Sequence, residues 1–291
     1  MAEFVDHLQL LPMPFRDGRR QPDGDHRPGG LGLATLSERL ERRGWTARVE
    51  DLGFDKPMPE SRLAEAFARA IGDGVESAWE RRRFPIVLSR AGYAALGVVD
   101  ALGAETGVVW ASARADYGAG GLFRRRPLDA KSLALLTGRA KRDKLAIRPT
   151  AAAGSRVVIL GAGRASSSER RALEADGIRV LGIDQAGRLA AELAGTEADG
   201  WYLHIDCSVL PASAAPGAEQ AGPDGIDPER LRTLVGEAFR DVRLRTVAIV
   251  GYDLNADASG ATLATLLGLI EAAAGAAGGV PRPETVGEAG G

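Results

Sequence analysis

The sequence predicts a three-layer α/β/α sandwich built on a mostly parallel, doubly wound β-sheet. Two observations support this fold class. Apolar runs of five to eight residues alternate along the chain with longer amphipathic stretches, which is the order expected of β-α-β units. Most of these runs are continuously apolar, as strands are when helices cover both faces of their sheet.

The apolar runs are expected to be strands, and the amphipathic stretches helices. In chain order, the expected strands are 7–13, 47–52, 84–88, 107–112, 156–160, 179–183, 201–208 and 246–253. The expected helices are 33–44, 61–71, 166–177, 227–241 and 259–275. Ser61 and Asp227 are good N-caps, and Ser166 and Glu169 have the spacing of a capping box.

Three stretches interrupt the alternation. Residues 17–30 form a polar segment, 211–226 a long Pro/Gly/Ala loop directly after a strand, and 275–291 a Gly/Ala/Pro-rich end. Because open α/β sheets bind ligands at the carboxyl ends of their strands, the second stretch is the best-placed loop for function. We expect one domain over 1–278, followed by a flexible tail over 279–291.

The amino-acid composition argues against several classes of protein. Of 291 residues, 45% are hydrophobic and 26% charged, as in soluble globular proteins. The net charge of −2 offers no field for nucleic acid or an anionic membrane, so neither is an expected partner. There is no apolar run near the ~20 residues that span a bilayer. The single cysteine, Cys207, excludes an internal disulfide and favours a cytoplasmic location.

The segment LHIDCSVLPASAAPGAEQAGPDGIDPERL resembles the most diagnostic block of the arginase/agmatinase (ureohydrolase) family. There a strand carries two aspartates spaced Asp-x-Asp. Leu-Asp-Pro, Pro-Gly and a Gly-Gly-Leu helix entry follow. The first aspartate matches Asp206, and Ser208 stands at the second. Leu210, Pro216 and Gly217 match the family. Pro211 and Ala212 replace its Asp-Pro, and Gly225 and Ile226 stand at the helix entry.

Two earlier blocks resemble the family's other metal-binding blocks. FPIVLSRAGYAALG resembles a strand, a His-containing turn and a helix, with Gly92 at the position of the histidine. VVWASARADY resembles a block with Trp followed by Asp-Ala-His-x-Asp. Ser112, Arg114 and Asp116 stand at its aspartate, histidine and second aspartate.

Three further blocks follow the family's order and spacing. GGLFRRRPLDAKSLALLTG resembles the substrate-facing loop, whose usual histidine falls near Arg124. VAIVGYDLNADASGATLA resembles the closing block, with Asp253 at a substrate-binding glutamate and Asn255 at an asparagine. RPGGLGLATLSERLERRG resembles the first helix and its lead-in. The likeness covers roughly residues 8–274 and implies an arginase-like fold.

The family's chemistry requires two manganese ions that share a hydroxide, which attacks a guanidinium carbon. The resemblance implies six ligand positions, four Asp and two His. This sequence keeps Asp116 and Asp206. Glycine and a protonated guanidinium cannot ligate a metal, and a neutral serine hydroxyl is a weak ligand. We therefore expect no binuclear metal centre and no other cofactor.

Strand alternation places Ser112, Arg114 and Asp116 on one face, and His204, Asp206 and Ser208 on the face that meets it. We predict that the Arg114 guanidinium lies between Asp116 and Asp206, where it replaces the charge of the metals. With Arg90 and Arg124 nearby, such a pocket would favour an anionic ligand.

Several of these residues have two interpretations. Asp116, Asp206, Arg114 and His204 are candidate catalytic residues. Asp116 and Asp206 form an acid/base pair or, by preference, hold Arg114 in place. His204 is a replacement metal ligand, a base or, by preference, a hydrogen-bonded core histidine. Cys207 points to the opposite side of the sheet and is expected to be inert. The candidate substrate-binding residues are Asp253, Asn255, Ser112, Ser208, Arg90, Tyr93 and Arg124.

A competing motif lies in VVILGAGRASSSERRALEADGIRVLGIDQ, which is similar to a dinucleotide-binding fingerprint. Gly161 and Gly163 follow an apolar strand, and Asp184 ends the next strand, where an acid would bind a ribose. Ser166 stands at the third glycine position, and no second nucleotide-binding half follows. Nucleotide binding is therefore the least favoured function.

The favoured function is that of a metal-independent enzyme acting on a small amine- or carboxylate-bearing metabolite, for which secondary metabolism would be a natural setting. The alternative is a non-catalytic pseudoenzyme, or a partner subunit of an active ureohydrolase. The resemblance implies trimers or hexamers, so a homo-oligomer or a hetero-oligomer with a related subunit is expected.

Overall fold

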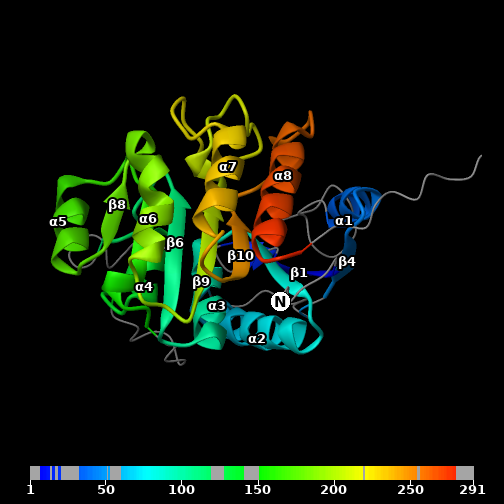
Figure 1. Ribbon diagram of the computed structural model, residues 1–291, viewed down its shortest axis with the longest axis horizontal. Helices are drawn as coiled ribbons and strands as arrows, with labels where there is room; N and C mark the ends of the chain where they lie inside the picture. The colour runs from blue at the N-terminus through cyan, green and yellow to red at the C-terminus, as the bar shows by residue number, and fades with distance from the viewer. Residues whose placement is uncertain are drawn as a thin grey trace, which may run out of the picture.

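The computed structural model describes residues 7–13, 15–16, 19–20, 33–50, 52, 60–118, 128–140, 151–218, 220–253 and 256–279. Its centre is an eight-stranded sheet in which each strand is parallel to its neighbours, with helices on both faces (Figure 1). This confirms the predicted three-layer α/β/α architecture.

The sheet has the strand order β4-β1-β5-β10-β9-β6-β7-β8. Its strands are β1 (His7–Met13), β4 (Thr46–Val49), β5 (Phe84–Ser89), β6 (Thr106–Ser112), β7 (Val157–Gly161), β8 (Arg179–Leu181), β9 (Gly200–Asp206) and β10 (Leu244–Val250). Each overlaps a segment predicted to be a strand, and the bounds differ by up to three residues. A separate antiparallel pair joins β2 (Phe15–Arg16) to β3 (Arg19–Arg20), so the stretch predicted as a loop contains a short strand.

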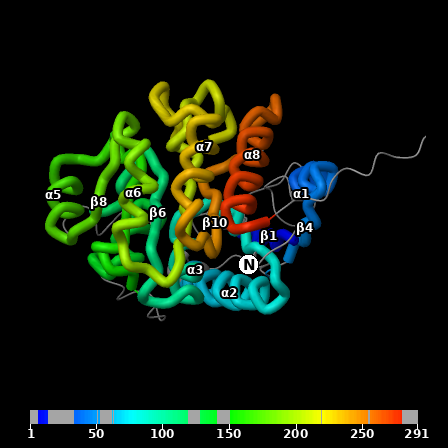
Figure 2. The backbone as a smooth tube through the Cα atoms, in the orientation of Figure 1, coloured from blue at the N-terminus to red at the C-terminus, as the bar shows by residue number. Residues whose placement is uncertain are grey.

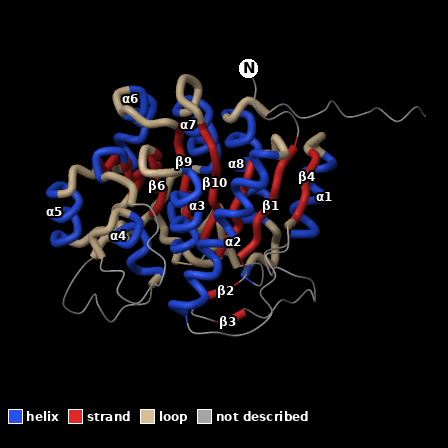
Figure 3. The backbone as a smooth tube through the Cα atoms, turned by 90° about the horizontal axis from the view of Figure 1, so that it is seen from below, coloured by secondary structure: helices blue, strands red, loops and turns tan. Residues whose placement is uncertain are grey.

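Two sets of helices cover the sheet, each with its own hydrophobic core (Figures 1 and 3). One face carries α1 (Leu33–Arg42), α6 (Leu189–Ala194), α7 (Pro228–Ala238) and α8 (Ala261–Ala276). The other carries α2 (Glu60–Glu80), α3 (Ala95–Leu102), α4 (Ser132–Leu136) and α5 (Ser167–Ala175). In Figure 2 the tube shows α7 and α8 on the opposite side from α2 and α3.

The strand order brings four loops together at one end of the sheet. After β5 the chain crosses to β6, and β9 and β10 later fill the space between them. Val250 is paired with both Ser89 and Asp206, and Ala111 with Ile205, so these strands end at nearly the same level. Their carboxyl ends form the topological switch point, where open α/β sheets bind ligands. None of the described helices is long and apolar enough to cross a membrane.

Candidate functional site

A small cavity opens at the carboxyl ends of the central strands. Its volume is about 10 Å³, close to the space that one water molecule occupies. It lies where the loops after β5, β6, β9 and β10 meet a short 3₁₀ turn, Asp129–Lys131. The lining residues are Arg90, Gly92, Arg114, Asp129, Asp206, Gln220, Val250 and Gly251.

The Arg114 guanidinium lies among three carboxylates. Its Nε is 3.5 Å from Oδ1 of Asp116, and its Nη2 is 3.5 Å from Oδ2 of Asp206. Nη2 also lies 3.9 Å from Oδ2 of Asp129, and Nη1 donates a hydrogen bond of 2.7 Å to Oε1 of Gln220. The pairing predicted between Arg114, Asp116 and Asp206 is therefore present, with two partners that the sequence did not reveal.

Asp116 reaches this cluster because the backbone leaves the strand conformation. Strand β6 ends at Ser112, whose Oγ accepts a hydrogen bond of 3.1 Å from the Arg114 amide. Asp116 has a φ of 48°, in the left-handed region that few non-glycine residues adopt. Its carbonyl accepts a hydrogen bond of 3.2 Å from the Ala134 amide. The predicted strand alternation is thus wrong beyond Ser112, although Asp116 still faces Arg114.

The two serines at family aspartate positions hold Asp206. Asp206 caps the 3₁₀ turn Cys207–Val209, because its Oδ1 accepts a hydrogen bond of 2.8 Å from the Ser208 amide. Ser112 Oγ lies 3.3 Å from Asp206 Oδ2, and Ser208 Oγ accepts a 3.4 Å bond from the Ala113 amide. Both serines are fully buried and neither lines the cavity.

At Gly92, the family's histidine position, helix α4 comes close to the backbone. A Cβ at Gly92 would lie 3.0 Å from Oγ and 3.2 Å from Cβ of Ser132. The Gly92 amide donates a 2.6 Å hydrogen bond to Oδ1 of Asp129. Asp129 and Ser132 therefore fill the space into which a larger side chain would extend. Sequence patterning missed Asp129 because it belongs to no strand, and its link to Gly92 is purely tertiary.

The predicted substrate-binding residues separate into three groups. Arg90 is 6% exposed and pairs with Asp253, at 3.0 Å between Nη2 and Oδ2. Tyr93 is buried in the α2/α3 core and does not line the cavity. Arg124 and Asn255 lie outside the described residues.

His204 lies in the core beneath the site. Its ring stacks on Trp110, with centroids 3.5 Å apart and an interplanar angle of 4°. Its Nδ1 lies 2.8 Å from the hydroxyl of Tyr202. Burial, assisted by the charge of Arg114, lowers the pKa of His204 to about 3. His204 is fully buried and hydrogen-bonded, which is the arrangement expected of the preferred core histidine.

Cys207 lies in the core on the opposite face of the sheet from Tyr202. Burial raises the pKa of its thiol well above the ordinary value, and the charge of Asp206 adds to this shift. The thiolate needed for nucleophilic attack is therefore disfavoured.

The pKa values of Asp116 and Arg114 are both shifted by their surroundings. Burial raises the pKa of Asp116 to about 8, although Arg114 acts in the opposite direction. For Arg114, burial lowers the pKa, but the coulombic effects of Asp116, Asp206 and Asp129 outweigh it and the net pKa is raised. The guanidinium thus stays charged, while a carboxyl group beside it can gain or lose a proton near neutral pH.

The charge balance of the described site is negative. Two guanidinium groups, of Arg90 and Arg114, face four carboxyl groups. The expectation of a pocket for an anionic ligand also counted Arg124, which lies outside the described residues, so it stays a prediction. Asp129 adds a carboxylate that strand alternation does not place.

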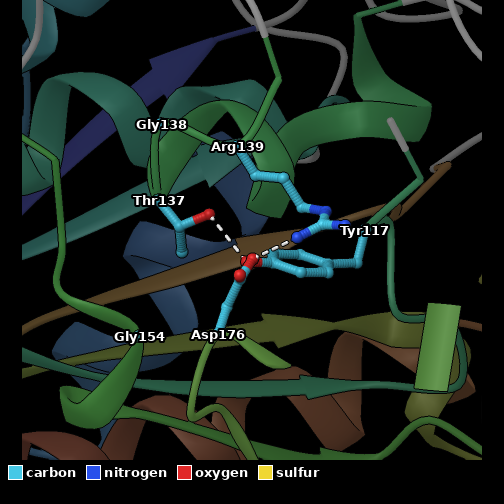
Figure 4. A pocket seen from close by; sticks show the side chains of 6 residues that line it. All are labelled: Tyr117, Thr137, Gly138, Arg139, Gly154 and Asp176. Atoms are coloured by element: carbon cyan, nitrogen blue, oxygen red, sulfur yellow. Dashed lines mark hydrogen bonds and ion pairs between the residues drawn. The ribbon is translucent and has the colours of Figure 1, made fainter. Parts of the chain in front are cut away.

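A hydrogen-bonded cluster anchors the segment that carries Arg114 and Asp116 (Figure 4). The Tyr117 hydroxyl donates to Oδ2 of Asp176 at 2.6 Å, and Thr137 Oγ1 lies 3.3 Å from the same hydroxyl. Arg139 pairs with Asp176 at 2.6 Å and lies over the Tyr117 ring, 5.5 Å from its centroid. The neighbouring cavity measures about 280 Å³. Tyr117 thereby ties the end of β6 to α4 and to the end of α5.

The glycine-rich turn between β7 and α5 contacts the site through Arg164. Ser166 and Glu169 form the predicted capping box at the start of α5. The Glu169 carboxylate therefore occupies the helix N-terminus, where a nucleotide phosphate would have to bind. Arg164 Nη1 donates a 2.6 Å hydrogen bond to the carbonyl of Gln220, and Asp184 is exposed. This geometry disfavours nucleotide binding.

Among the residues that the structure describes, no three or more His, Cys, Asp and Glu side chains are grouped so that they could hold a metal ion. The aspartates around Arg114 are instead arranged about its guanidinium.

Comparison with known proteins identifies the fold family. The sequence model of the arginase family matches residues 8–274. Arginase from Bacillus subtilis superposes with a TM-score of 0.74 at 22% identity, covering 92% of this chain and 98% of that one. Entamoeba histolytica arginase, in complex with L-ornithine, gives 0.75 at 15% identity, with 94% and 99% covered.

A protein with a different activity also shares this fold. Proclavaminate amidino hydrolase from Streptomyces clavuligerus superposes with a TM-score of 0.67 at 16% identity, covering 93% of this chain and 90% of that one. A search of curated protein sequences finds no significant match. The family match spans nearly the whole chain, and the sheet order and switch point agree with it: this chain belongs to the arginase family.

Proposed function

We propose that this arginase-family protein works without a two-metal centre, as an enzyme acting on a small amine- or carboxylate-bearing metabolite. The observation that carries the proposal is the Arg114 guanidinium, within 4 Å of Asp116, Asp129 and Asp206. Two adjacent dications need several carboxylates and imidazoles as ligands. A guanidinium in their midst repels them and occupies the same carboxylates.

The residues do not fit the family's metal pair. Gly92 offers no donor atom, and Ser132 stands where its side chain would extend. The hydroxyls of Ser112 and Ser208 are already engaged with Asp206 and the Ala113 amide. In the proposed site Arg114 supplies the fixed positive charge. Asp116 is the group that exchanges a proton, and Arg90 with Asp253 orients the ligand. A cytoplasmic location is part of the proposal.

Metal analysis provides the direct test. We expect protein purified without chelators, in buffers containing manganese, to hold far less than one manganese ion per chain. It should also release no urea from a panel of guanidino compounds, because no metal-bound hydroxide can form without the metals. Two stoichiometric manganese ions together with urea release would reject the proposal.

A second function is favoured by the small size of the cavity. About 10 Å³ among the described residues leaves room for a water molecule but not for a metabolite. This supports a non-catalytic role, in which the chain is a pseudoenzyme or a partner subunit in an oligomer with a related active chain.

The substitution Asp206→Asn separates the two functions. It keeps the shape of a side chain that touches Ser112, Ser208 and Arg114 but removes its charge. We expect the variant to fold and to lose complementation of a strain that lacks the gene, because the pocket needs the carboxylate. Asp184→Asn, at an exposed aspartate, is the matched control and should complement fully. Complementation by a folded Asp206→Asn variant would favour the non-catalytic role.

A further inference from the structure

A second cavity lies between the ends of α4 and α5 (Figure 4). Its volume is about 280 Å³, whereas the cavity at the candidate site measures about 10 Å³. Pockets that hold small molecules start at ~300 Å³, so the second cavity has room for a small ligand. The described residues that line it are Tyr117, Thr137, Gly138, Arg139, Gly154 and Asp176. None of them lines the cavity at the candidate site, so the two cavities are separate.

The Asp176 carboxylate is hydrogen-bonded through only one of its oxygens within the described part of the chain. Its Oδ2 accepts a 2.6 Å bond from the Tyr117 hydroxyl and another of 2.6 Å from Arg139 Nη1. No described residue donates a hydrogen bond to Oδ1. Because an ionised carboxylate accepts hydrogen bonds at both oxygens, Oδ1 is able to accept one from a ligand.

The Arg139 guanidinium offers donors beside that oxygen. A guanidinium carries five N–H groups, and among the described residues Arg139 donates only to Asp176, through Nη1. The guanidinium is held over the Tyr117 ring, 5.5 Å from its centroid. The side chains of Arg139 and Asp176 are both partly exposed, so a ligand can reach them from solvent.

The protonation states of the cluster are well defined near neutral pH. Burial raises the pKa of Tyr117 to about 12, and its hydrogen bond to Asp176 adds to this shift, so the phenol keeps its proton and donates it. Burial acts to raise the pKa of Asp176, but the hydrogen bonds from Tyr117 and Arg139 outweigh it, and the net pKa is lowered. Asp176 is therefore ionised, and its charge cancels that of Arg139.

We propose that the second cavity is a binding site for a neutral carboxamide. The amide N–H of the ligand donates to Asp176 Oδ1, and its carbonyl accepts from the remaining N–H groups of Arg139. An anion would compete with Asp176 for Arg139, and a cation would compete with Arg139 for Asp176. A planar amide, which carries a donor and an acceptor side by side, bonds to both residues and leaves their ion pair intact.

Three matched probes test the recognition of an amide. Benzamide has both the donor and the acceptor, benzoate has acceptors and a negative charge, and N,N-dimethylbenzamide has no N–H group. With a Kd on the order of 1 mM, benzamide at about 10 mM should raise the thermal unfolding midpoint of the wild type by about 2 °C. Benzoate and N,N-dimethylbenzamide at the same concentration and ionic strength should leave the midpoint unchanged.

A pair of variants and a spectroscopic measurement locate the site. Arg139→Met removes the donors to the ligand carbonyl and should lose the benzamide response. Arg188→Met removes an exposed guanidinium that is also paired with a carboxylate, that of Glu192, but lies outside the cavity lining, and it should respond as the wild type does. In an NMR titration of the wild type, benzamide should shift the backbone amide signal of Gly138, whatever the stability of the variants.

Each outcome decides for or against the amide site. A benzamide response in the wild type and Arg188→Met that is lost in Arg139→Met, together with a shifted Gly138 signal, supports the proposal. An equal response in Arg139→Met, no response in the wild type or an unchanged Gly138 signal overturns it. A benzoate response as large as that of benzamide would reveal an anion site instead, and an equal response to N,N-dimethylbenzamide would reveal apolar binding. Both of these results reject amide recognition.

Discussion

Replacement of Arg114 by methionine is expected to lower the free energy of unfolding by about 3 kcal/mol near neutral pH, the scale found when a buried ion pair loses one partner. The substitution leaves Asp116, Asp129 and Asp206 facing each other with side chains 7%, 14% and 7% exposed. Their mutual repulsion is then no longer compensated by a cation. Urea unfolding of the wild type and the variant measures the difference.

The effect of Arg114→Met should grow with pH. Burial raises the pKa of Asp116, and removal of the guanidinium takes away the charge that acts to lower it. A carboxyl group of this kind binds its proton more tightly in the folded state, so its contribution to stability falls as pH rises between the two values. We therefore expect a smaller loss at about pH 5 than at about pH 8.

Arg139→Met is the control for this prediction. Arg139 and Asp176 have side chains 32% and 34% exposed, so solvent screens their pair. Its loss should change stability by at most about 1 kcal/mol. An Arg114→Met variant as stable as the wild type at about pH 8 would contradict the role assigned to the guanidinium.

The fold was predictable because each strand of the large sheet corresponds to an apolar run in the sequence. Each strand of the parallel sheet overlaps a predicted segment, since burial on both faces leaves little room for polar side chains. Helices α3, α4 and α6 were not among the amphipathic stretches predicted as helices. They span eight, five and six residues, too few for an amphipathic repeat to stand out. The β2–β3 pair was missed for a similar reason, because each strand has two residues.

The site was predictable only where strands determine it. Arg114 follows β6 and Asp206 ends the adjacent β9, so their approach could be inferred from sequence. Asp129 and Gln220 come from loops, whose positions depend on tertiary contacts with Gly92 and Arg164. Neither contact leaves a periodic signal in the sequence. These two residues supply the third carboxylate and the hydrogen bond that fixes the guanidinium.

The substitution Gly161→Ala is expected to lower the free energy of unfolding by about 3 kcal/mol, from backbone strain and overpacking together. Gly161 has a φ of 104°, which alanine adopts only with strain. An added Cβ would lie 2.7 Å from the carbonyl oxygen of Ser112. That carbonyl also accepts a 2.7 Å hydrogen bond from the Ala162 amide. The disturbance should therefore reach the end of β6, and urea unfolding would measure it.

Gly163→Ala provides the internal control within the same turn. No atom lies within 4 Å of the position that a Cβ would take at Gly163, so stability should change by at most about 0.5 kcal/mol. A dinucleotide-binding turn would instead use both glycines to let a pyrophosphate approach the helix. Thermal stabilisation of the wild type by a dinucleotide, lost in Gly163→Ala, would favour nucleotide binding. If the two substitutions differ in their effect on stability and no dinucleotide stabilises the protein, Gly161 is required for the pairing of β7 with β6. This pairing keeps Ser112 in place beside Asp206.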